Sequence, residues 1–208
     1  MIERDPEKAV LDKYIQDATV LFLDIQGFTT LVQEHPPEKI NHVIESYFSA
    51  FFEVIQKHGG DVNETAGDGM MVIFLDQEPM QHARNTVQAA LNIQTKCQLL
   101  QKEKGSELFP ITVKIGISSG EVYLGSTKMR GIEDSRWTFT ASGPVTILAA
   151  RLSEYGRGGQ ILVGEETARR LGSAFRVSRL GKLPLKNIED SGEVFEIRDI
   201  DNPQPGVS

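Results

Sequence analysis

Cysteine is almost absent from this chain, and its scarcity limits the kinds of site that can form. Among 208 residues, only Cys97 carries a thiol. The chain therefore has no intramolecular disulfide and no cysteine-based zinc site. For the same reason we expect a cytoplasmic protein, because a reducing compartment suits a chain without disulfides.

Basic residues are outnumbered, with 22 lysines and arginines against 29 aspartates and glutamates and a net charge of −7. Affinity for a nucleic-acid backbone comes from clustered lysine and arginine side chains, so we expect no nucleic-acid partner. A small anionic substrate is compatible with this balance if metal ions offset the acidity around it.

Long apolar runs are missing as well. No stretch is long enough to span a membrane, and residues 1–6 lack the basic and apolar regions of a signal peptide. Hydrophobic residues make up 39% of the chain, which is enough for a packed core. We expect a leader at residues 1–17, one globular domain at residues 18–200 and a flexible tail at residues 201–208.

The chain does show a regular alternation of strand-like and helix-like segments. Strands are predicted where short apolar runs are bounded by turn residues, and helices where apolar residues recur every three or four positions. The predicted strands cover residues 18–24, 61–66, 70–75, 136–141, 161–163, 175–181 and 193–199, and residues 111–125 form a strand pair or one bent strand. The predicted helices cover residues 27–34, 79–102, 143–155 and 165–171, with another amphipathic helix ending at residues 58–60.

The order of these segments predicts an α+β fold. Strand-helix-helix-strand-strand-helix-strand, or βααββαβ, is the order of a ferredoxin-like split βαβ core, here with a C-terminal extension. Such a sheet is expected to carry its helices on one face. The other face then needs cover, which a second copy of the chain supplies most simply.

Two aspartates are the first candidate site residues. Asp24 ends an apolar run, and Asp68 lies in the turn Gly67-Asp68-Gly69 between two predicted strands. Carboxylates at strand ends, beside turns with free backbone N–H groups, can hold divalent cations against a polyphosphate. Taken singly, Asp24 also suits the cap of the following helix, and Asp68 suits an ordinary hairpin turn.

Several motifs place these aspartates in a known context. The strings 22–29, 67–69, 116–122, 143–152, 159–163 and 185–188 resemble, in this order, the class III nucleotidyl cyclases, which are the adenylate and guanylate cyclase catalytic domains. The resemblance covers about residues 18–198. It implies the class III cyclase fold and a dimer, either a homodimer or a pair with a related cyclase chain, with sites between the subunits. The implied reaction converts a nucleoside triphosphate into a 3′,5′-cyclic monophosphate and pyrophosphate, in intracellular signalling.

The resemblance also implies metal and phosphate sites. Two ions per site, Mg²⁺ or Mn²⁺, would be held by Asp24, Ile25 and Asp68. The phosphate-holding loop would consist of Gly27, Phe28 and Thr29, in which the glycine lets the backbone approach the ligand.

Three basic residues match charged positions of the family. Arg151 lies where the resemblance implies an arginine that stabilises the transition state, a role suited to an always-charged, forked guanidinium. Lys182 and Arg136 lie near implied phosphate-binding positions. For both of these residues, ordinary surface charge is the favoured interpretation, and phosphate binding is the alternative.

Three positions depart from the family pattern or conflict with one another. Ile147 replaces the ribose-orienting asparagine, which would cost on the order of 10²–10³ in rate. Glu64 resembles the glutamate that reads guanine, whereas Thr140 is compatible with adenine. We therefore expect a cyclase for which ATP is favoured and GTP is the alternative. The competing hypothesis is a degenerate domain that binds nucleotide or dimerises as a regulatory module with little turnover.

Overall fold

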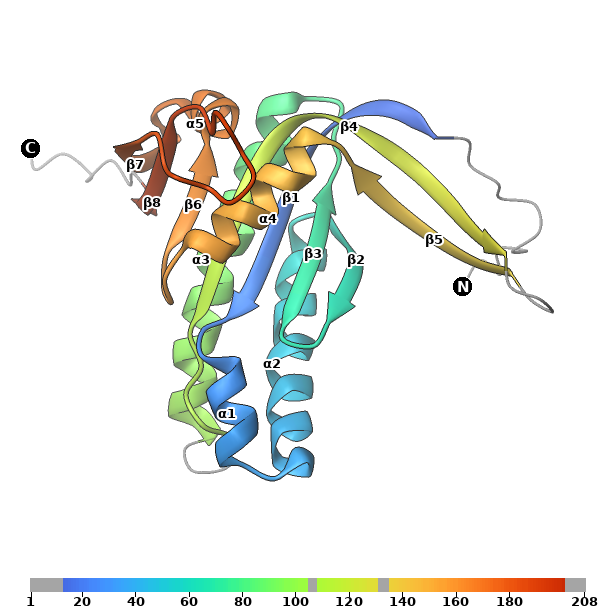
Figure 1. Ribbon diagram of the computed structural model, residues 1–208. Coiled ribbons are helices and arrows are strands. Elements are labelled where there is room, and N and C mark those ends of the chain that lie inside the picture. The colour runs from blue at the N-terminus through green and yellow to red at the C-terminus, as the bar shows by residue number, and fades with distance from the viewer. Residues whose placement is uncertain (1–12, 105–107, 131–134, 201–208) are drawn as a thin grey trace, which may run out of the picture.

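A β-sheet with helices on both faces forms the body of the molecule (Figure 1). The structure, a computed structural model, describes residues 13–104, 108–130 and 135–200. Within them the sheet has eight strands in the order β2-β3-β1-β4-β6-β8-β7, and β5 pairs with β4 outside this path. The strands are β1 (Tyr14–Ile25), β2 (Gly60–Ala66), β3 (Gly69–Phe74), β4 (Val113–Arg130), β5 (Ser135–Ser142), β6 (Ile161–Gly164), β7 (Phe175–Gly181) and β8 (Val194–Ile200).

The helices occupy the predicted segments. They are α1 (Phe28–Glu34), α2 (Pro37–Lys57), α3 (Pro79–Lys104), α4 (Pro144–Tyr155) and α5 (Glu165–Leu171), with a 3₁₀ turn, η2, at Gly172–Ala174. The order β1-α1-α2-β2-β3-α3-β4 is the βααββαβ core, so the predicted fold class is confirmed.

Strand β1 lies at the centre of the core and pairs antiparallel with both β3 and β4. Because side chains alternate between the faces of a strand, its residues divide into two sets. Leu21, Leu23 and Ile25 pack with α2 and α3 in the main core, whereas Val20 and Phe22 belong to a cluster on the opposite face.

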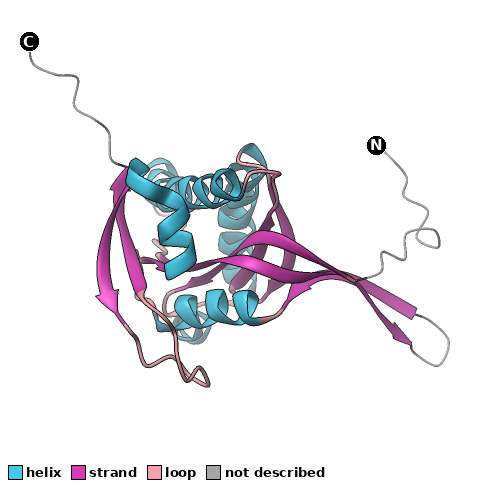
Figure 2. Ribbon diagram, turned by 90° about the horizontal axis from the view of Figure 1, so that it is seen from above, coloured by secondary structure: helices cyan, strands magenta, loops and turns pink. Residues whose placement is uncertain are grey.

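That opposite face also carries a helix, so the expectation that the helices lie on one face is wrong. Figure 2 shows helices on both sides of the strands. Helix α4 packs Val145 and Ala149 into the second cluster, beside Val20 and Phe22. Gly116 of β4 permits this approach, because a Cβ there would lie 2.2 Å from the carbonyl oxygen of Ala149.

Two strands are longer than predicted. Strand β1 begins at Tyr14 rather than residue 18, because residues 14–17 pair with Glu121–Leu124 of β4. The segment predicted at residues 111–125 forms one continuous strand rather than a strand pair: β4 begins at Val113 and continues to Arg130. Beyond Tyr123, β4 pairs with β5 in an arm that projects from the body in Figure 1.

A buried polar network ties β1 to α3 and α5, at the end of β1 away from Asp24. His82 of α3 is 1% exposed, and its ring bonds Asp17 at 2.9 Å and Thr19 at 2.7 Å. Arg170 of α5 donates to both oxygens of Asp17, at 2.6 and 2.8 Å. Each polar group in this network therefore has a partner, which buried polar groups require.

None of the helices in the described part of the chain is long and apolar enough to cross a membrane.

Candidate active site

The hairpin of β2 and β3 brings Asp68 to the end of β1. The N–H of Ile25 donates to the carbonyl oxygen of Asp68 at 3.2 Å, and Asp24 lies opposite Gly69 in the strand register. The two aspartates, distant in the sequence, thus meet at one edge of the sheet. The side chain of Ile25 is 1% exposed in the core, so Ile25 can offer a ligand only its main-chain carbonyl.

The two carboxylates interact directly. Burial raises the pKa of Asp68 to about 6, and a hydrogen bond with Asp24 and the charge of Asp24 add to this rise. Paired carboxylate oxygens in a partly buried place are the donors that Mg²⁺ and Mn²⁺ take, and a divalent cation would offset their mutual repulsion. The donor set therefore fits the implied metal ions.

Lys114 of β4 is a charged member of this site that the sequence reasoning missed. Its Nζ lies 2.7 Å from Oδ2 of Asp24, because the two residues face each other across the β1–β4 register. A possible signal was the position of Lys114 just before the motif that begins at Gly116. Lys114 lies within a predicted strand, however, and only the pairing of β1 with β4 shows that Asp24 is its neighbour.

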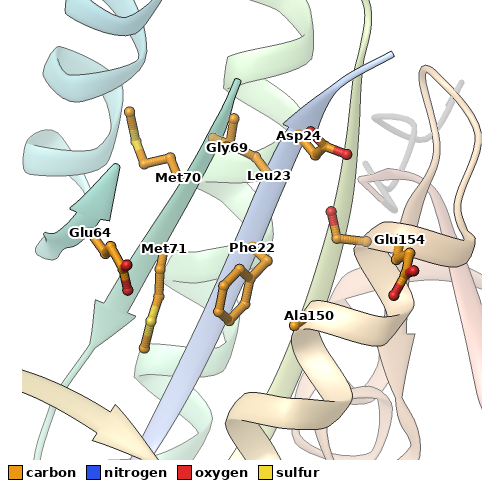
Figure 3. Close-up of a pocket in the computed structure, with 10 residues that line it drawn as sticks. Phe22, Leu23, Asp24, Glu64, Gly69, Met70, Met71, Ala150 and Glu154 are labelled. Carbon is orange, nitrogen blue, oxygen red and sulfur yellow. The ribbon is translucent and has the colours of Figure 1, made fainter. Parts of the chain in front are cut away.

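A pocket of about 270 Å³ opens beside Asp24. Figure 3 shows Asp24 and Glu154 on one side of it and Glu64 on the other, with Phe22 and Met71 between them. Its wall is therefore apolar in the middle and carboxylate-bearing at both sides. Such a wall can hold a flat ring against Phe22 and Met71 and offer hydrogen-bond acceptors to its edge.

The predicted phosphate loop follows Asp24 and Ile25, two of the predicted metal ligands, in the sequence. Gly27 precedes α1 with a φ of 72°, a conformation that favours glycine, and a Cβ added there would meet nothing within 4 Å. Phe28 packs partly buried against the main core, and Thr29 is exposed in the first turn. The need for glycine here comes from the left-handed turn, and the space beside it is open.

Arg151 lies on α4, between Ala150 and Glu154 in the sequence, but unlike these two it does not line the pocket. Its Nη1 donates to Oε2 of Glu154, and its buried Nε has no hydrogen-bond partner among the described residues. Ser153 of the same helix is buried and donates to the main-chain oxygen of Lys114 at 3.3 Å. This bond fixes α4 relative to the strand that carries Lys114.

Three of the remaining predicted site residues, Thr140, Ile147 and Lys182, are not among the described residues that line this pocket. Thr140 lies in β5, where its hydroxyl donates to the carbonyl of Ala141, and Ile147 is 52% exposed on α4. Lys182 follows β7 and pairs with Asp190 at 3.0 Å. Arg136 is in β5, but its side chain lies outside the described residues. The structure therefore brings Asp24, Asp68 and Glu64 together, and Thr140, Ile147 and Lys182 lie outside this group.

Known proteins share both the sequence pattern and this architecture. The family model described as the adenylate and guanylate cyclase catalytic domain matches residues 10–198. The chain is similar to an adenylate cyclase of Mycobacterium tuberculosis, with 28% identity over 185 residues, 88% of this chain and 40% of that protein. It thus spans about two-fifths of that relative's length.

Solved structures show the same fold. The adenylyl cyclase CyaB from P. aeruginosa superposes with a TM-score of 0.85 at 24% identity, covering 94% of this chain and 100% of that one. The guanylyl cyclase Cya2 superposes with a TM-score of 0.81 at 26% identity, covering 93% and 97% of the two chains. With a family model that matches nearly its whole length, the chain belongs to the adenylate and guanylate cyclase catalytic domain family.

Proposed function

We propose that this chain is a nucleotidyl cyclase domain that converts a nucleoside triphosphate into a 3′,5′-cyclic monophosphate and pyrophosphate. One observation carries the proposal: Asp24 and Asp68, from separate motifs, meet beside a pocket that can hold a ring. Membership of the cyclase family supports the same reaction. We place this activity in cytoplasmic signalling.

In the proposed reaction, acidic residues bind the metal ions and basic residues bind the phosphates. Asp24, Asp68 and the carbonyl of Ile25 would hold two ions, Mg²⁺ or Mn²⁺, which activate the ribose 3′-oxygen and neutralise phosphate charge when bound. Lys114 brings an ammonium group to within 2.7 Å of Asp24, close enough to share a phosphate with this site. Gly27, Phe28 and Thr29 form the turn beside it. Arg151 would offset the charge that develops on the leaving phosphates.

We propose that the working unit is a dimer, either of two copies or of this chain with a related one. Thr140 and Ile147 do not line the pocket beside Asp24, so a base and ribose pocket that includes them needs a second chain. Exposed apolar residues support such contact: Ile147 is 52% exposed, and Ile15 and Tyr123, paired in register, are 58% and 51% exposed.

The base is proposed from two positions. Thr140 is compatible with adenine, and for this reason we favour ATP. Glu64, on the pocket wall, can accept from the N1–H and amino group of guanine, which makes GTP the alternative.

The direct test is incubation of the purified chain with Mn²⁺ and each of ATP, GTP, CTP and UTP, with the products separated by mass. A cyclic monophosphate from at least one triphosphate is expected, and Asp24→Ala or Asp68→Ala should abolish it while leaving the fold intact. An Asp24→Ala variant with unchanged turnover would sink the proposed metal site.

Complementation tests the two-chain site. An inactive Asp24→Ala chain mixed with an inactive Arg151→Ala chain should recover part of the activity, because each mixed dimer keeps one complete site. The mixture must first be shown to contain mixed dimers, for instance by native mass spectrometry with one chain tagged. No recovery in such a sample would argue for a site built within one chain.

A second candidate function rests on Ile147. An exposed isoleucine offers a ribose no hydrogen bond, which favours a regulatory module that binds nucleotide with little turnover. Tight binding of a triphosphate with Mn²⁺, without any cyclic product, would support this candidate over the enzyme.

A further inference from the structure

Glu154 is a carboxylate of the pocket that the proposed reaction does not use. It lies on α4, lines the pocket beside Asp24, and stands three residues after Arg151 (Figure 3). Its side chain is 50% exposed, so burial does not force it to pair. Its carboxylate nevertheless accepts a hydrogen bond from Nη1 of Arg151.

This contact leaves the guanidinium only partly satisfied. Arg151 binds Glu154 through Nη1, while its buried Nε has no partner among the described residues. A guanidinium carries five N–H donors and binds phosphate oxygens best through a planar fork. A polyphosphate that reached Arg151 would therefore offer it better partners than the single-ended contact with Glu154.

The backbone of α4 is held against the sheet, so only the side chains of Arg151 and Glu154 can move. Ser153 bonds the main chain of Lys114, and Gly116 brings the helix backbone against β4. The helix is thus fixed, whereas the side chains of Arg151 and Glu154 are 31% and 50% exposed and can rotate. Exchange of one partner for another needs only side-chain rotation.

We propose that Glu154 is a built-in competitor for Arg151: it holds the guanidinium through the contact with Nη1 and must be displaced by the phosphates of the substrate. Glu154 is thus an autoinhibitory positioning residue that acts through Arg151. The inference rests on the proposed function, in which Arg151 serves the phosphates. In this role Glu154 weakens substrate binding rather than assisting catalysis.

The test removes the charge of Glu154 and keeps its shape. Glu154→Gln should lower KM for the triphosphate, or raise kcat/KM, by about two- to fivefold. A change of this size corresponds to the loss of one exposed ion pair. In an Arg151→Gln background the same substitution should change neither quantity. Glu53→Gln is the matched control, because it removes an exposed glutamate of a helix, α2, away from the pocket.

A binding measurement separates this inference from the proposed function. Calorimetric titration with inorganic tripolyphosphate and Mg²⁺ should show two- to fivefold tighter binding for Glu154→Gln, and no gain for Glu154→Gln in the Arg151→Gln background. This result would support the competitor role even if no triphosphate were cyclised. An unchanged affinity, weaker binding of Mn²⁺ or tripolyphosphate, or an equal gain without Arg151 would overturn it.

Discussion

Nζ of Lys114 lies 2.7 Å from Oδ2 of Asp24, so a lysine is paired with one of the two proposed metal ligands. The pair follows from the strand register, in which β4 places Lys114 directly opposite Asp24. An ammonium group there repels a divalent cation, but it also attracts a phosphate. Its removal should therefore act on metal and nucleotide in opposite directions.

Lys114→Met should bind free Mn²⁺ about two- to fivefold more tightly and should raise KM for the triphosphate about fivefold, since about 1 kcal/mol of charge interaction is lost in each case. Titration of free Mn²⁺ by electron paramagnetic resonance measures the first change, and steady-state kinetics the second. Lys102→Met, at an exposed position of α3, is the control. A fall in both affinities would show that Lys114 supports the fold of the site rather than its charge.

The contact between β4 and α4 predicts a strong effect of a single methyl group. A Cβ on Gly116 would lie 2.2 Å from both the carbonyl oxygen of Ala149 and the backbone nitrogen of Ser153. Gly116→Ala must therefore push α4 off the sheet, and should lower the free energy of unfolding by about 2–3 kcal/mol. Urea denaturation measures this loss.

Gly164→Ala is the matched control for that prediction. The atom nearest to its Cβ would be a side-chain carbon of Leu148, at 3.2 Å, and a leucine can change its rotamer; Oγ of Ser118, at 3.7 Å, would be in ordinary contact. Its φ of −72° suits alanine. We expect Gly164→Ala to cost less than 1 kcal/mol, about the usual effect of a point substitution. Equal costs at the two glycines would contradict the tight packing of α4.

The buried network, together with the more exposed Glu166 and Arg169 of α5 beside it, predicts that acid weakens the fold. A hydrogen bond from Arg170 lowers the pKa of Asp17, hydrogen bonds from Arg169 and Arg170 lower that of Glu166 to about 2, and burial lowers the pKa of His82. Each group binds fewer protons when folded, so each stabilises the fold above its unfolded pKa and loses that effect as pH falls. Stability should therefore decline from about pH 6.5 downward.

Arg170→Met tests the origin of this decline. The charges that face His82 are Asp17, Arg170 and the more distant Asp76, so removal of Arg170 leaves Asp17 with the imidazole alone. We expect a loss of about 1–3 kcal/mol at pH 7 and a flatter profile between pH 5 and pH 3, because an unpaired Asp17 regains a higher pKa. Urea unfolding at a series of pH values measures both. A profile as steep as that of the original protein would place the acid sensitivity elsewhere.

The sequence predicted the parts of the fold that depend on neighbouring residues. The Gly67-Asp68-Gly69 turn and the apolar face of α2 are local patterns, and both are confirmed by β2, β3 and α2. Periodicity could not reveal that α4 lies on the opposite face, because an apolar stripe does not say which surface it meets. Gly116 was the one sequence signal for the close packing of α4 on β4, but a glycine within a strand can also mark a bulge or a bend.

In the candidate site, too, the sequence predicted the residues that lie in local motifs and missed those that depend on distant contacts. Motifs predicted Asp24 and Asp68, and the hairpin brings them together. Lys114 was missed because its role depends on a cross-strand partner far away in the sequence. Glu154 was missed because an i, i+3 pair on a helix is usually a solvated contact. The roles of all the predicted site residues, including Asp24 and Asp68, stay predictions.

Ile147 gives the last prediction, because an isoleucine cannot hold a ribose hydroxyl. Desolvating that hydroxyl without a partner costs about 1–3 kcal/mol, and the family resemblance places an asparagine at this position. Ile147→Asn should therefore raise kcat by about five- to 100-fold, rather than only lower KM, if the contact strengthens in the transition state.

The structure makes this a clean substitution, because Ile147 is 52% exposed and its change should alter stability by less than about 0.5 kcal/mol. Ile147→Ala removes the same apolar bulk without adding an amide, and it should leave kcat low. Both variants are assayed as stable dimers with all four triphosphates, because an asparagine on α4 could also affect a partner chain. If Ile147→Asn is no faster on any of them, the ribose is held by other groups, and the nucleotide-binding module becomes the better account of this chain.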